Sequence, residues 1–136
     1  MTHPWALPLL VGAGGFAGSA ARYGLGIASQ RFAFDWPVGT FAANILGCFI
    51  IGVIVTLAGR GETLTPEVRL ALATGFCGGF TTMSSFMYET AEMIRASEYL
   101  HAAVYAAGTF LLSFAAFFAG VVTIRILIRI GGALWN

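Results

Sequence analysis

The segment that decides the fold is Gly75-Phe-Cys-Gly-Gly-Phe-Thr-Thr-Met-Ser-Ser-Phe86, which lies in the middle of an apolar stretch of membrane-spanning length. Its twelve positions hold three glycines and four hydroxyl residues. Backbone groups that face lipid cannot be left without hydrogen bonds, so a helix broken at this depth must be buried or must line a polar cavity. The segment therefore predicts a broken membrane helix that offers oxygen ligands and hydroxyl donors to an ion.

The composition of the whole chain is that of a membrane protein. Of 136 residues, 58% are hydrophobic and 10% are charged, whereas a soluble domain carries about 25% charged residues. Four apolar stretches come close to the roughly 20 residues that span a bilayer; they cover residues 5–29, 37–58, 66–94 and 100–130. We expect an all-α fold in which residues 1–136 form one four-helix transmembrane domain, with the third helix broken near its middle.

The first stretch ends in the small residues Gly18-Ser-Ala-Ala21, as a cleaved signal peptide would. However, Met1-Thr-His-Pro-Trp5 contains no Lys or Arg, and a signal peptide begins with positive charge. We therefore expect this stretch to be retained as a span.

The charges leave the orientation of the chain open. With the N-terminus inside, the cytoplasmic side would hold four arginines and the other side two; the six are Arg60, Arg69, Arg125 and Arg129 against Arg31 and Arg95. Such a bias is weak, so it allows either a preference for one orientation or insertion both ways with head-to-tail pairing. The net charge of +1 and the absence of basic clusters argue against nucleic-acid binding.

Acidic residues are absent from the first two spans and from the middle of the last, and only Glu89 and Glu92 fall late in the third. Proton- and cation-coupled transporters place carboxylates in their spans, so this pattern favours an anion passage. Cys48 and Cys77 have no metal-like spacing and are expected to be small buried residues.

The first two spans carry three polar candidates. Arg22 either snorkels to the interface or provides a fixed positive charge at an aqueous vestibule. Thr40 and Asn44 are four residues apart and share a helical face. Asn44 would either hold helices together or donate to a dehydrated anion.

The third and fourth spans supply the remaining candidates. Gly78 and Gly79 favour an opening of the third helix, and Ser84 and Ser85 follow as donors. The ring of Phe86 has a positive edge that can receive an anion. In the last span, a hydroxyl stripe occupies positions i, i+4 and i+8 beside phenylalanines that are expected to pack or to face lipid; the stripe consists of Tyr105, Thr109 and Ser113, and the phenylalanines are Phe110, Phe114, Phe117 and Phe118.

Taken together and in order, three motifs resemble the Fluc (CrcB-type) fluoride channel family. They are Gly14-Gly-Phe-Ala-Gly-Ser-Ala-Ala-Arg-Tyr23, the Gly39-Thr40 to Gly47 segment with Asn44, and Gly78-Gly-Phe-Thr-Thr-Met-Ser-Ser-Phe86. The resemblance implies an antiparallel, dual-topology homodimer in the bacterial inner membrane with two fluoride pathways. It also implies a central structural sodium ion and no catalytic step.

By position, the resemblance assigns the sodium ligands to the backbone carbonyls of Gly78 and Thr81 from each subunit. It places Arg22 and Thr40 in the vestibule. The implied fluoride pathway comprises Asn44, Met83, Ser84, Ser85, Phe86, Tyr105, Thr109 and Ser113.

The chain departs from the family pattern at Met83, where an aromatic residue is usual. Methionine is polarizable and flexible but has no ring edge, so transit there would depend on hydroxyl groups. We still expect conduction, because Asn44 and Phe86 are present.

Two other classes of protein fit part of the pattern. A small dual-topology exporter of organic cations would need a carboxylate in the first helix, but the first acidic residue is Asp35, in a loop. A non-transporting helical subunit would pack through the small residues spaced four apart in the first span, at positions 14 and 18 and at positions 15 and 19, but it would give no reason for a polar break.

Overall fold

The computed structural model describes residues 5–31, 36–59 and 64–134, and these parts are helices joined by short turns, with no strand among them. The expected all-α fold is thereby confirmed. His3, Asp35 and Arg60, which the sequence interpretation used, lie outside the described residues.

The helices follow the expected apolar stretches. The first two are α1 (Ala6–Ser29) and α2 (Val38–Ala58), and the last is α6 (Tyr99–Leu134). The third stretch is divided into α3 (Pro66–Leu70), the π-helix η1 (Ala71–Cys77), α4 (Gly78–Phe80) and α5 (Met83–Arg95). Arg125 and Arg129 lie on α6, within a continuous helix.

Two helices among the described residues are long and apolar enough to cross a membrane. These are α2, with a mean hydropathy of 2.4, and residues Tyr99–Gly131 of α6, with a mean hydropathy of 2.3. Only 22% and 6% of the most apolar stretch of these two segments is buried inside the chain, and large side chains of α6 such as Leu111, Phe114 and Leu127 are exposed. Such surfaces suit lipid or another membrane helix.

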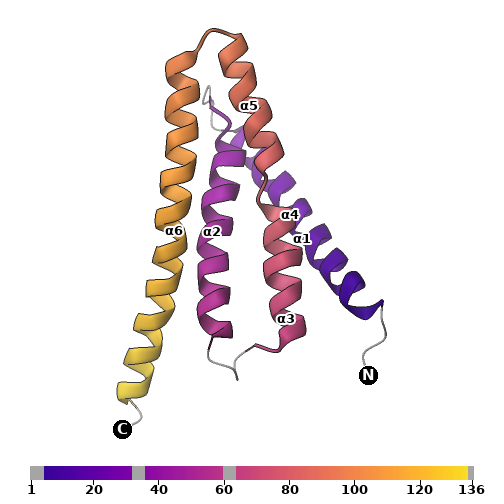
Figure 1. The fold of residues 1–136 in the computed structure, drawn as a ribbon, viewed down its shortest axis with the longest axis vertical. Helices are drawn as coiled ribbons and strands as arrows, with labels where there is room; N and C mark the ends of the chain where they lie inside the picture. Colours follow the sequence, from indigo (N-terminus) through magenta and orange to yellow (C-terminus); the bar gives the residue numbers. More distant parts are fainter. Residues whose placement is uncertain (1–4, 32–35, 60–63, 135–136) are drawn as a thin grey trace.

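The helices form an up-and-down bundle in which α1 begins, and α6 ends, at the same end of the molecule (Figure 1). α2 packs along α6, and α1 packs along η1 and α4. The break between α4 and α5 lies near the middle of the third stretch (Figure 1).

Glycines bring α1 against the backbone of the third stretch. A Cβ atom at Gly18 would overlap the carbonyl oxygen of Phe76 and lie 2.8 Å from the amide nitrogen of Phe80. Likewise, a Cβ atom at Gly79 would overlap the carbonyl oxygen of Gly15. Small residues permit such backbone contact between membrane helices.

The helix breaks at Thr81 and Thr82, not at the glycines before them. Thr81 (φ −80°, ψ 158°) and Thr82 (φ −151°, ψ 117°) are extended. The predicted break is confirmed; Gly78 and Gly79, which the sequence indicated as favouring the opening, are helical in α4 and directly precede it. Gly79 is needed for contact with α1 rather than for opening the helix.

A tight turn joins α5 to α6. Ser97 has a positive φ of 64°, and the amides of Ser97 and Glu98 donate to the carbonyls of Ile94 and Met93. This pattern is a Schellman motif, which ends one helix and reverses the chain. It places α6 antiparallel to α5.

We predict that Gly18→Ala lowers the melting temperature of the purified protein in detergent. The added methyl group would push against backbone rather than a movable side chain, and such overpacking costs typically about 1–3 kcal/mol. Gly12→Ala is the matched control, since nothing lies within 4 Å of a Cβ atom there. Equal melting temperatures for the two variants would contradict the proposed contact.

Candidate functional site at the helix break

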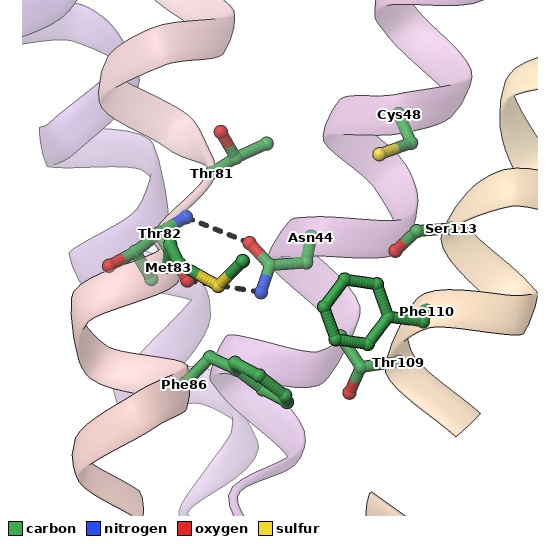
Figure 2. Close-up of a pocket in the computed structure, with 9 residues that line it drawn as sticks. All are labelled: Asn44, Cys48, Thr81, Thr82, Met83, Phe86, Thr109, Phe110 and Ser113. Carbon is green, nitrogen blue, oxygen red and sulfur yellow. Dashed lines mark hydrogen bonds between the residues drawn. The ribbon is translucent and has the colours of Figure 1, made fainter. Parts of the chain in front are cut away.

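A cavity of about 260 Å³ lies between the break and α6 (Figure 2). Its walls come from α2, from the extended residues with the start of α5, and from α6. The lining residues are Asn44, Cys48, Thr81, Thr82, Met83, Phe86, Thr109, Phe110 and Ser113. The structure thus gathers five of the eight predicted pathway residues around one space, namely Asn44, Met83, Phe86, Thr109 and Ser113.

Asn44 binds the broken backbone through both ends of its amide. Its Oδ1 accepts a hydrogen bond from the amide of Thr82 at 2.8 Å, and its Nδ2 donates to the carbonyl of Thr82 at 3.1 Å (Figure 2). The side chain therefore replaces the partners that an unbroken helix would provide. Of the two interpretations above, the structure supports the helix-joining one. Donation to an anion stays a prediction, because the NH₂ group carries a second hydrogen.

The hydroxyl groups after the break form a cluster around Thr82. Its Oγ1 accepts from the amide of Ser85 at 3.2 Å and caps α5. The same oxygen lies 3.2 Å from Oγ of Ser84 and 3.1 Å from Oγ of Ser85. Ser84 and Ser85 consequently lie beside the cavity rather than in its wall.

The residues of the hydroxyl stripe on α6 differ in their hydrogen bonds. Thr109 Oγ1 donates to the carbonyl of Tyr105 at 2.7 Å, within the helix. Ser113 Oγ is buried and has no hydrogen-bond partner among the described residues. A buried hydroxyl without a partner is uncommon, so Ser113 presents an unused donor at the cavity wall.

Tyr105 belongs to a second polar cluster, centred on Glu89. The Glu89 carboxylate accepts from Thr40 Oγ1 at 2.6 Å and from Tyr105 Oη at 2.7 Å. Three helices therefore meet at one carboxylate. The sequence interpretation noted Glu89 as an exception but gave it no role, although an acidic residue in a span is a signal of function.

The aromatic wall of the cavity contains Phe110, which the sequence predicts to pack or to face lipid. The ring of Phe86 is buried and lies 5.7 Å from the ring of Phe110, edge to face at 88°. It also lies 5.3 Å from the ring of Tyr105. Phe110 also lines the cavity, which its position three residues before Ser113, on the same helical face, could have indicated.

Arg22 and Thr40 line a separate open depression of about 420 Å³ between α1 and α2. The structure therefore brings the two predicted vestibule residues together. Arg22 Nε also donates to the carbonyl of Gly79 at 3.1 Å, which the sequence did not reveal.

The two carbonyls expected to bind sodium have lost their helical donors. The amide of Thr82, four residues after Gly78, bonds to Asn44 instead. The amide of Ser85, four residues after Thr81, bonds to the Thr82 side chain instead. Carbonyls freed by an unwound membrane helix are suitable ligands for Na⁺, so the Gly78 and Thr81 oxygens fit such an ion.

Asn44→Ala is predicted to destabilise the protein strongly, because the amide and carbonyl of Thr82 would both lose their partners. Each unsatisfied buried group costs about 1–3 kcal/mol. Thr123→Val is the control, since that hydroxyl is exposed and bonds only within its own helix. In detergent, Asn44→Ala should unfold at a clearly lower temperature than Thr123→Val. If Asn44→Ala unfolds at the wild-type temperature, the amide does not hold the break.

Comparisons with known proteins show which family the chain resembles in sequence. Residues 9–121 match the family model described as CrcB-like protein, Camphor Resistance (CrcB). A relative from Prosthecochloris aestuarii is 43% identical over 93% of this chain and 98% of its own length. One from Chlorobaculum tepidum is 49% identical over 87% and 94%, and one from Caulobacter vibrioides is 46% identical over 86% and 94%.

All three relatives carry the name "Fluoride-specific ion channel FluC". The matches run through the helix break and include every candidate residue, since these lie between positions 22 and 113. On this coverage, the chain belongs to the CrcB-like protein family.

Proposed function

We propose that the protein is a fluoride channel through which fluoride leaves the cytoplasm passively. The observation that carries the proposal is identity of more than two-fifths, over almost the full length, to relatives named as fluoride-specific ion channels. Such a protein moves an ion and catalyses no reaction.

The geometry of the cavity suits a small, strongly hydrated anion. A narrow pore must replace the ion's water with hydrogen-bond donors, and neutral, distributed donors bind the ion without trapping it. Ser113 offers a hydroxyl without a partner, and Asn44 retains one amide hydrogen. The edges of the Phe86 and Phe110 rings carry partial positive charge. Ser84 and Ser85 would extend the donor set beyond the cavity.

The Glu89 cluster lies where the pathway would continue toward the Arg22 depression. Thr40 lines that depression and bonds to Glu89, which in turn bonds to Tyr105. Two donated hydrogen bonds offset the negative charge of the carboxylate, which would otherwise repel an anion. Arg22 lines the same depression.

In the proposed assembly, residues 1–136 form one domain that crosses the bacterial inner membrane four times and pairs with an antiparallel copy. Arginines at both ends of the bundle, such as Arg31 and Arg69, give no strong orientation. Gly78 is exposed, and nothing lies within 4 Å of a Cβ atom there. A second copy could therefore reach its carbonyl.

A sodium ion bound between two copies would supply a fixed positive charge at the break. The carbonyls of Gly78 and Thr81 from each subunit would hold it. The ion would take the place of the N–H donors that these carbonyls lose at the break.

Met83 lines the cavity and is 59% exposed. It presents a flexible thioether where the family has a ring. Conduction is expected nevertheless, because the neighbouring donors and Phe86 remain in place.

The alternative, an exporter of organic cations, requires a membrane-embedded carboxylate in the first helix. α1 contains no acidic residue. Glu89 is embedded but lies on α5, and it already accepts two hydrogen bonds. The proposed channel is therefore favoured.

The proposal is tested with purified protein in vesicles loaded with potassium fluoride, using a fluoride electrode. We predict rapid fluoride release when a potassium ionophore is added, and no chloride release from matched potassium chloride vesicles. Fluoride release no faster than from protein-free vesicles would refute the channel. Uptake of an organic cation driven by a proton gradient would instead support the exporter.

Phe86→Leu is predicted to slow fluoride release about tenfold, because an aromatic contact of about 1–1.5 kcal/mol is removed from the pathway. Phe16→Leu is the matched control, since that ring is 79% exposed on α1. Release from both variants is compared in the same vesicles. Equal rates would remove Phe86 from the proposed pathway.

A further inference from the structure

Arg22 makes a specific contact that a free vestibule charge would not need. Its Nε atom donates to the carbonyl of Gly79 at 3.1 Å, and Ser19 Oγ donates to the same oxygen at 3.4 Å. Gly79 is the second of the three residues in α4. Its carbonyl therefore lies at the end of the first half of the broken helix.

This end of the half-helix needs a cap. In a continuous helix the carbonyl of Gly79 would accept from the amide of Met83, four residues later. The extended residues Thr81 and Thr82 intervene, and Met83 begins the next helix. Carbonyls at a helix C-terminus lack intrahelical donors, so a side-chain N–H from a neighbouring helix stabilises them.

One face of α1 both packs against the half-helix and caps its C-terminal end. Gly15, Ser19 and Arg22 occupy positions i, i+4 and i+7, which share a face. The backbone at Gly15 lies so close to Gly79 that a Cβ atom at Gly79 would overlap the carbonyl oxygen of Gly15. The arginine side chain is thereby held in register with the Gly79 carbonyl.

We propose that Arg22 is a positioning residue, which fixes the end of the broken helix through its Nε–H bond to Gly79. The carbonyl of Gly79 lies between the carbonyls of Gly78 and Thr81 in the chain, so holding it sets the direction of the peptide groups at the break. The same bond keeps Thr82 in reach of Asn44. This inference rests on the proposed fluoride channel for its functional part and on the described contacts for its structural part.

Three substitutions separate positioning from charge. Glutamine carries a neutral N–H at the position of arginine Nε, since three carbons precede the nitrogen in both side chains. Lysine keeps the positive charge but has a methylene group at that position. Methionine has similar length with neither charge nor donor. If Arg22 acts by its bond to Gly79, Arg22→Gln should keep a larger fluoride current and slower amide exchange than Arg22→Lys. If it acts by charge, Arg22→Lys should keep the larger current and slower exchange.

The functional readout is the unitary fluoride current in planar bilayers, because a merely lower yield of folded protein does not change it. Arg22→Met is expected to lower the current about tenfold, the size of effect of losing one hydrogen bond of about 1.4 kcal/mol. Arg22→Gln should recover most of that loss, and Arg22→Lys should not. Arg95→Lys is the control, since that side chain is 78% exposed and pairs only with Glu92 in the described structure.

The structural readout is amide hydrogen exchange at residues 82–86 in the purified protein, which is independent of conduction. Exchange should be roughly tenfold faster in Arg22→Lys and Arg22→Met than in Arg22→Gln. The proposal would be overturned in favour of a vestibule charge if Arg22→Lys kept the wild-type current and exchange rate while Arg22→Gln lost current and exchanged faster. Equal behaviour of all three variants would also overturn it. If the wild-type protein carries no fluoride, the channel function fails, and the exchange result alone decides the positioning role.

Discussion

The structure depends on one constraint, which is that backbone exposed by a broken membrane helix must find other hydrogen-bond partners. In the bilayer interior each unsatisfied group costs several kcal/mol. Here side chains from other helices supply the partners. Asn44 of α2 binds both backbone groups of Thr82, and Arg22 of α1 binds the carbonyl of Gly79. The break can therefore persist at a depth where it would otherwise refold into a helix.

Close packing makes those side-chain contacts possible. Glycines on α1 and on the third stretch allow the two backbones to touch. α2 approaches α6 in the same way, since a Cβ atom at Gly52 or Gly120 would overlap backbone of the opposite helix. With both pairs of helices held at short distance, the side chains that line the cavity project from fixed positions. The cavity then combines apolar walls with few donors, which suits brief binding of a dehydrated anion.

Much of this arrangement could be predicted from the sequence, and the failures have physical causes. Long apolar stretches and the cluster of glycines and hydroxyls indicated the helices and the break correctly. The role of Gly78 and Gly79 could not be predicted, because glycine can serve either flexibility or close contact, and only the packed neighbour decides which. The π-helical segment Ala71–Cys77 rotates the residues that follow it about the helix axis. No local sequence pattern predicts that rotation.

Contacts between segments far apart in the chain could not be predicted from the sequence either. The Glu89 cluster joins residues 49 and 16 positions apart, and the bond from Arg22 to Gly79 spans 57 positions. Spacing along one helix shows which residues share a face, but it does not show what that face meets. Tyr105 illustrates the point, since its place in the hydroxyl stripe was evident while its partner was not.

The most direct measurement is the hydrogen-exchange protection of the Thr82 amide by nuclear magnetic resonance in lipid bilayers. Thr82 has extended backbone outside any helix, yet its amide bonds to Asn44. We predict protection comparable to that of amides inside α2. Rapid exchange of this amide, at the rate of an unpaired group, would contradict the claim that side chains of neighbouring helices sustain the break.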